Sequence, residues 1–137
     1  MPVPFAILAL DHVVLRAADP ARLEKFYVEV LGCPVDLRQE HIKLVQLRAG
    51  RSQIDIVPAG VDAAAKAAAA RAGANVDHIC LQIDPWDPDA ISGHLTANGV
   101  EHDAEVKSRY GAEGRGPSIY LTDPEGNRVE LKGPGAR

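Results

Sequence analysis

The chain has 137 residues with a formal net charge of −4, and 46% of the residues are hydrophobic and 25% charged. This length fits one compact domain that buries a core without disulfide staples. The acidic balance and the scattered basic residues exclude a surface for nucleic acid or for an anionic membrane, and no stretch is long enough to span a bilayer. Cys33 and Cys80 form no disulfide framework and no C-x-x-C motif, so the expected location is the reducing cytoplasm.

The first half of the chain predicts a strand, a helix and three further strands. Residues 9–16 are rich in β-forming residues and predict the first strand. Asp19-Pro20 predicts a helix start, with an N-cap followed by proline at the first helical position. An amphipathic stripe follows until Gly32, made by Leu23, Phe26, Tyr27, Val30 and Leu31. Strands are then expected over 35–39, 42–48 and 52–57.

The second half repeats this pattern after an alanine-rich linker at 61–75, which predicts at most a short helix. Residues 76–81 match residues 10–15, including an Asp-His pair, and Asp87-Pro88 starts a second helix. The hairpin over 118–131, which turns at 123–126, matches residues 45–56. We therefore predict an α+β fold of two tandem βαβββ modules, 1–60 and 76–137, within one compact domain.

Four polar residues occupy duplicated positions. His12 and His78 lie in the first strands of the two modules, and Asp55 and Glu130 lie in the last strands. Strand alternation places each of them on the face opposite the apolar residues of its strand. If the sheets of the modules join and curve, two imidazoles and two carboxylates converge. This mixed N/O set suits one divalent ion, Zn, Ni, Mn, Fe or Co, and leaves coordination positions open, as in a catalytic site.

A structural interpretation of the same residues stays open. A histidine in a strand is commonly a hydrogen-bonded structural residue. Arg128, Glu130 and Lys132 would then be the charges of a solvated sheet face. Cys80 shares the strand face of His78, where it lines the pocket or serves as a small buried filler rather than as a nucleophile.

These motifs resemble the vicinal oxygen chelate superfamily, which contains glyoxalases, bleomycin-resistance proteins and extradiol dioxygenases. The resemblance lies in Leu-Asp-His12, in Asp-His78-Ile and in the closing Asp-Pro-Glu-Gly-Asn-Arg-Val-Glu130-Leu, and covers nearly all of the chain outside the linker. It implies paired modules that form a metal-holding half-barrel, usually in a homodimer. By position, it implies His12, His78 and Glu130 as metal ligands. Asp55 stands where a fourth ligand is usually glutamate, and reaches the metal directly or through water.

The last hairpin also looks like the fosfomycin-resistance branch, where the tyrosine of a Ser-x-Tyr-x-x-Asp-Pro-x-Gly stretch faces the substrate. The resemblance implies that Tyr120, and with it Ser118, lines a substrate pocket, and that Tyr120 and Glu130 are the catalytic candidates. Gln46 holds the position of Tyr120 in the first module and is a further pocket candidate.

The preceding stretch, 109–116, is rich in glycine and contains Arg109 and Arg115. It is expected to be either a flexible lid that grips an anionic substrate or a plain surface loop.

The implied function is a divalent-metal-dependent enzyme that acts on a small oxygenated substrate. Two neighbouring substrate oxygens would chelate the ion, whose Lewis acidity stabilises an oxyanion or enediolate, and Glu130 or Asp55 would act as base. A glyoxalase-like lyase or isomerase is the first interpretation. The alternatives are an Fe(II) extradiol-type dioxygenase, with His12, His78 and Glu130 as its triad, a fosfomycin-like thiol transferase, and a non-catalytic small-molecule-binding resistance protein.

Overall fold

The computed structural model describes residue 4 and residues 6–59 and 76–136. The chain divides into two compact units, Met1–Asp62 and Ala63–Arg137. The predicted linker at 61–75 lies outside the described residues. None of the helices in the described part of the chain is both long enough and apolar enough to cross a membrane.

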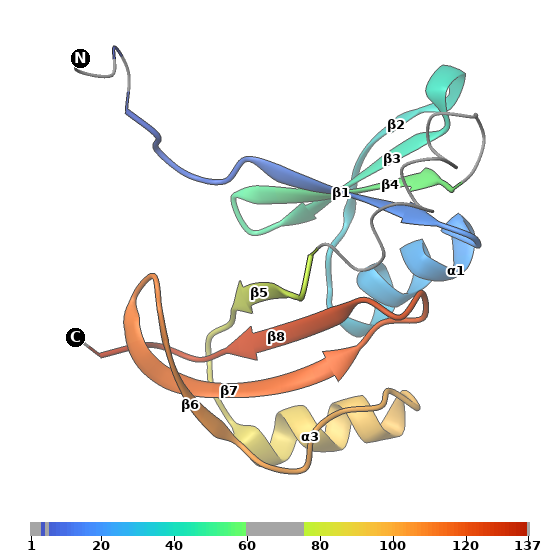
Figure 1. The fold of residues 1–137 in the computed structure, drawn as a ribbon. Helices are drawn as coiled ribbons and strands as arrows, with labels where there is room; N and C mark the ends of the chain where they lie inside the picture. Colours follow the sequence, from blue (N-terminus) through green and yellow to red (C-terminus); the bar gives the residue numbers. More distant parts are fainter. Residues whose placement is uncertain (1–3, 5, 60–75, 137) are drawn as a thin grey trace. The chain divides into compact units, whose positions relative to one another are not determined.

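The described residues of the first unit form a four-stranded mixed sheet and the helix α1 (Figure 1). Its elements are β1 (His12–Ala17), α1 (Pro20–Lys25), the π-helical turn η1 (Phe26–Val30), β2 (Val35–Gln39), the 3-10 turn η2 (Glu40–Ile42), β3 (Leu44–Ala49) and β4 (Ser52–Pro58). The strand order is β1-β4-β3-β2, in which β1 and β4 run parallel and the other pairs antiparallel.

The second unit repeats this topology. Its elements are β5 (Ile79–Gln82), α3 (Pro88–Ala97), β6 (Lys107–Gly111), β7 (Gly114–Thr122) and β8 (Arg128–Lys132). The strand order is β5-β8-β7-β6, and β5 runs parallel to β8. The predicted α+β fold of two tandem βαβββ modules is confirmed.

The helices α1 and α3 begin where the sequence predicts. The Asp19 side chain accepts a hydrogen bond from the Arg22 backbone N–H at 3.1 Å, and Asp87 accepts one from Ala90 at 3.1 Å. In each helix proline follows the cap, where its missing N–H costs nothing. The first strand is shorter than the predicted 9–16, because the register of this edge strand with β4 begins only at His12.

The sheet of the second unit has two different faces, and α3 runs along the sheet (Figure 1). The predicted apolar layer is buried and consists of Ile119, Leu121, Val129 and Leu131. The opposite face contains Ser118, Tyr120, Glu130 and Lys132, and these side chains are also buried. The interpretation of Glu130 and Lys132 as solvated surface charges is therefore wrong, because both lie at 5% exposure or less.

The stretch 109–116, predicted as a lid or surface loop, is instead the end of a β-hairpin. β6 and β7 pair up to Gly111 and Gly114, so only residues 112–113 form the turn. The glycines are needed for close contact rather than for flexibility. A Cβ at Gly111 would lie 3.0 Å from the Lys132 side chain, and one at Gly116 would lie 2.7 Å from a backbone oxygen of the C-terminal tail.

Candidate functional site

In the second unit, His78 lies immediately before β5 with both ring nitrogens engaged. Its Nδ1 is 2.7 Å from Oδ2 of Asp77, and its Nε2 is 3.1 Å from Oε1 of Glu130 on β8. The hydrogen bond with His78 lowers the pKa of the Asp77 carboxyl. A carboxylate at one ring nitrogen fixes the orientation and tautomer of an imidazole. Asp77 therefore holds the ring with Nε2 directed at Glu130.

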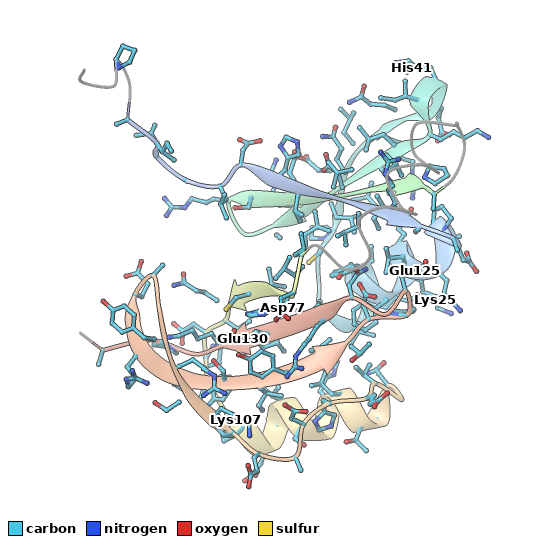
Figure 2. The ribbon with its side chains drawn as sticks, viewed as in Figure 1. Lys25, His41, Asp77, Lys107, Glu125 and Glu130 are labelled. Carbon is cyan, nitrogen blue, oxygen red and sulfur yellow. The ribbon has the colours of Figure 1, made fainter. Side chains whose placement is uncertain are left out.

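Glu130, labelled on β8 in Figure 2, is a buried carboxylate surrounded by donors. Its Oε2 accepts a hydrogen bond from the Ser118 hydroxyl at 2.6 Å. Burial would raise the pKa of Glu130, but the hydrogen bonds from Ser118 and Tyr120, together with His78, outweigh burial and hold this pKa below its usual value. Glu130 is therefore an anion at neutral pH, and each of its oxygens has a donor.

Tyr120 connects this cluster to a cavity. Its ring meets the His78 ring edge-on, with 5.5 Å between the centroids. The Arg128 guanidinium lies 4.4 Å from the centroid of the Tyr120 ring, in cation–π geometry, and 3.7 Å from Asp103. Tyr120, Arg128 and Asp103 help to line a cavity of about 380 Å³ within the second unit. Tyr120 is thus both a partner of Glu130 and a wall of this cavity.

Cys80 lies on β5 directly opposite Glu130 on β8. Desolvation and then the neighbouring Glu130 charge raise the pKa of the Cys80 thiol to about 11, against a smaller opposing effect of Lys132. Cys80 is therefore a thiol rather than a thiolate at neutral pH, which agrees with its exclusion as a nucleophile. It is exposed, however, and not the buried filler that the sequence favoured.

Arg109 and Arg115 point to opposite faces of the hairpin. Arg109 pairs with Gly116, and Arg115 with Tyr110, so alternation places only Arg109 on the face of Ser118. Both arginines are exposed. A two-arginine grip on one anion does not follow from this register.

The first unit contains a second histidine held by its preceding aspartate. His12 Nδ1 is 2.7 Å from Oδ2 of Asp11. This hydrogen bond raises the pKa of His12. Desolvation lowers that pKa by a smaller amount, and the charge of Asp55 raises it further. Asp55 is 2% exposed; its Oδ2 accepts a hydrogen bond from Gln46 at 3.2 Å, while its Oδ1 is buried without a hydrogen-bond partner among the described residues. Such an oxygen is costly unless a proton or a cation meets it.

Gln46 belongs to a ladder of side-chain amides across β2, β3 and β4. Gln39 donates to Gln46 at 3.1 Å, and Gln46 donates to Gln53 at 3.3 Å as well as to Asp55. The sequence predicts Gln46 only as the counterpart of Tyr120 and does not predict its contacts with Gln39 and Gln53. Their seven-residue spacing was the available signal, because short hairpins bring such positions side by side.

The described residues include ligand types that a divalent transition ion prefers, imidazole and carboxylate. Among the described residues, no group of three or more His, Cys, Asp or Glu side chains is arranged to hold a metal, and each unit supplies one histidine and one carboxylate. In the second unit, the 3.1 Å between His78 Nε2 and Glu130 Oε1 suits two ligands of one ion. Bonds of about 2.1 Å that meet at a right angle place their donor atoms about 3.0 Å apart.

Comparison with known proteins identifies relatives over nearly the whole chain. The model of the Glyoxalase/Bleomycin resistance protein/Dioxygenase superfamily matches residues 9–131. Virulence protein STM3117 of Salmonella typhimurium is 30% identical over 123 residues, which cover 89% of this chain and 81% of that protein.

Solved structures share the fold. Integron cassette protein VCH_CASS1, from the mobile metagenome of V. cholerae, has a TM-score of 0.77 and 28% identity, with 96% of this chain and 98% of that chain covered. TnmS3, an antibiotic binding protein from Streptomyces sp. CB03234, has a TM-score of 0.71 and 21% identity, with 96% and 99% covered. Lactoylglutathione lyase from Agrobacterium tumefaciens has a TM-score of 0.63 and 22% identity, with 93% and 95% covered. At these identities the last two show the fold alone.

Proposed function

The chain belongs to the glyoxalase/bleomycin resistance protein/dioxygenase superfamily, and from this premise we propose that it is a divalent-metal-dependent enzyme acting on a small oxygenated molecule. His12, His78 and Glu130 would hold the ion, with Asp55 as a fourth donor, directly or through water. The bound ion would supply Lewis-acid stabilisation of negative charge that develops on two neighbouring substrate oxygens. The proposed reaction is that of a glyoxalase-like lyase or isomerase.

The contact between His78 and Glu130 carries this proposal. Nδ1 of His78 lies 2.7 Å from Asp77, and Nε2 lies 3.1 Å from Oε1 of Glu130, so an imidazole nitrogen and a carboxylate oxygen converge at the separation of two ligands of one ion. Asp77 orients the ring, as carboxylate partners do for metal-binding histidines. A divalent ion would take the place of the hydrogen bond between Nε2 and Oε1 and bind both atoms.

The first unit supports the proposal independently. Asp11 holds His12 by the same ring nitrogen through which Asp77 holds His78, at the same 2.7 Å. The Oδ1 of Asp55 is buried and has no hydrogen-bond partner among the described residues, so it is available as a metal ligand. The same Asp-His contact thus occurs in both halves of the duplication, as expected for paired ligands with oriented rings.

The two carboxylates are prepared for different proton chemistry. Glu130 is stabilised as an anion by Ser118, Tyr120 and His78, so it takes a proton only when one of these donors moves away. Asp55 has one oxygen without a partner among the described residues, and that oxygen can accept a proton without breaking a hydrogen bond. Either carboxylate would serve as the base, with the Tyr120 hydroxyl as the adjacent donor.

We further propose a homodimer in a reducing cytoplasm with a small-molecule substrate. The second candidate function is non-catalytic binding of a small molecule, as the name of TnmS3 states for that protein. The observation that favours it is the cavity of about 380 Å³ beside Tyr120, a volume within the range of small-molecule sites.

Metal content tests the proposal. Elemental mass spectrometry of the purified protein, and of metal-free protein reloaded with Zn, Ni, Mn, Fe(II) or Co, should find about one tightly bound ion per chain. Such an ion should also raise the melting temperature, since an ion at 100 times its Kd stabilises by about 2.7 kcal/mol. The identity of the ion would separate an Fe(II) dioxygenase from a Zn, Ni or Mn lyase.

A double variant tests the ligands. His78→Ala with Glu130→Ala should abolish tight binding, whereas a control with His41→Ala and Glu105→Ala, two exposed positions, should bind as the unmodified protein does. Unchanged metal content in the first double variant would refute the ligand set. No ion bound, and no thermal stabilisation by any ion, would favour the binding protein.

A further inference from the structure

Lys132 is a buried cation on the face of the sheet that contains Ser118 and Glu130. Ser118 pairs with Lys132 across β7 and β8, and alternation places these three side chains on one face. Lys132 is only 3% exposed. Its Nζ donates a hydrogen bond to the Gly114 carbonyl oxygen at 2.9 Å. Nothing in the proposed metal site uses this charge.

Glycines on the neighbouring strands leave the space that the Lys132 side chain occupies. A Cβ at Gly111 would lie 3.0 Å from Cε of Lys132, and one at Gly116 would lie 3.0 Å from its Nζ. The Lys132 side chain therefore occupies space that a side chain at either of these positions would fill. A neutral donor could make the same bond to Gly114 without burying a charge, so the contact with the hairpin does not by itself explain a lysine.

The charge of Lys132 is poorly compensated. An ammonium group has three N–H donors, and one of them is used by Gly114. Lys132 forms no ion pair with any carboxylate in the described part of the chain. The carboxylate two residues away, Glu130, already accepts a hydrogen bond from Ser118 and contacts His78. A buried charge is costly unless a counter-charge meets it. The remaining donors suit an anion that comes from outside the protein.

We propose that Lys132 determines specificity by binding an anionic group, a carboxylate or a phosphonate, at the far end of the substrate. This inference rests on the proposed function, in which two neighbouring oxygens of the same substrate engage the metal beside Glu130. The Cα atoms of Glu130 and Lys132 are about 7 Å apart, as for any two residues i and i+2 of a strand. The Lys132 side chain extends further toward Gly114, so a chain of several atoms must separate the chelating oxygens from the anion.

Hydroxamates that differ only in chain length and in the charge of the far end test whether Lys132 binds an anion at that distance. Hydroxamates chelate a metal through two neighbouring oxygens, and we would compare chains that end in a carboxylate or a phosphonate with methyl-ended chains of equal length. Calorimetry on the metal-loaded protein should find the anionic compound of the best length about 10- to 100-fold tighter, as for a charge-assisted hydrogen bond. Lys132→Met should abolish this preference and leave the methyl-ended compound bound within about twofold. Lys107→Met is the matched control, because Lys107 also pairs with Ser118 and points to the same face but is more exposed.

Metal-free protein gives a readout that does not depend on the ion. Glutarate and methylphosphonate, titrated at constant ionic strength, should bind weakly to the unmodified protein and to the Lys107→Met control. Binding to Lys132→Met should fall about tenfold or more. If methyl-ended hydroxamates fail to bind the metal-loaded protein, the proposed function fails, while this second titration still tests Lys132.

Lys132→Gln keeps a donor for the Gly114 carbonyl and replaces the methionine variant if that one does not fold. An anionic preference that survives in either folded variant would overturn the proposal, as would the absence of any preference, at every chain length, in the unmodified protein. A lower melting temperature with an unchanged preference would make Lys132 only a structural link between β8 and the hairpin.

Discussion

Ser118→Ala is the most direct test of how Glu130 is kept ionised. The substitution removes the hydroxyl that donates to Glu130 Oε2 at 2.6 Å, and it does so at a fully buried position. A hydrogen bond to a charged group contributes about 1.5–3 kcal/mol. Tyr120 and His78 remain as partners of Glu130, so we expect a loss near the lower end, about 1.5–2 kcal/mol in the free energy of unfolding by urea at neutral pH.

The pH dependence of this loss gives the sharper measurement. The folded pKa of Glu130 lies below its ordinary value of 4.5, so its contribution to stability is fully present above pH 4.5 and is lost as the pH falls through the folded pKa. Ser118→Ala raises that folded pKa toward 4.5, and the difference in stability between the two proteins should therefore shrink in acid.

An exposed serine on the neighbouring strand serves as the control. Ser108→Ala should change stability by less than about 0.5 kcal/mol at either pH. A Ser118→Ala loss that is the same in acid as at neutral pH would refute the reasoning, because the serine would then act by packing and not through the Glu130 charge.

Three further outcomes follow from the geometry. Asp77→Asn removes the carboxylate that orients the neighbouring histidine, so metal affinity by calorimetry should fall about 10- to 100-fold. Gly116→Ala places a Cβ 2.7 Å from a backbone oxygen and should cost about 1–3 kcal/mol in urea unfolding, whereas Gly93→Ala, with nothing within 4 Å in α3, should gain about 1 kcal/mol. Cys80, with its pKa raised to about 11, should react slowly with iodoacetamide near neutral pH, and Glu130→Gln should speed the alkylation measured by peptide mass spectrometry.

Each of these has a result that counts against it. Unchanged metal affinity in Asp77→Asn would mean that the ring is oriented by other contacts. Similar stability changes for Gly116→Ala and Gly93→Ala would show that stability does not depend on the close contact between Gly116 and the C-terminal tail. Alkylation of Cys80 as fast as that of a free thiol would contradict its raised pKa.

The parts of the fold that depend on neighbouring residues could be predicted from the sequence. The start of α1 requires only Asp19 and the residues that follow it. The turn after β7 is likewise local, because the Asp123 side chain accepts hydrogen bonds from the backbone of Glu125 and Asn127 at 2.9 Å. The duplication extended these local signals to a strand order, since two copies of one pattern fold to one topology.

The features that escaped prediction depend on residues far apart in the chain. Lys132 follows Glu130 in an alternating strand and looks like a surface charge, but glycines of β6 and β7 cover it. The βαβββ pattern implies a strand between the second helix and the last hairpin, but the sequence does not locate β6, because Lys-Ser-Arg-Tyr-Gly lacks an apolar alternation and the strand is defined by its pairing with β7. The Oδ1 of Asp55 has no partner among the described residues, and this depends on side chains from neighbouring strands, which no local sequence pattern predicts.

The parallel pairing at one edge of each sheet has a consequence for the order of folding. In each unit the last three strands pair with their neighbours in sequence, β2 to β4 in the first unit and β6 to β8 in the second. The first strand, β1 or β5, pairs only with the last strand of its own unit. Contacts between distant segments form late because the entropy of closing the loop must first be overcome. His78 therefore reaches Glu130 only when its unit closes. A cation bound by this pair would slow unfolding more than it speeds folding, and kinetic stability would then report on metal loading.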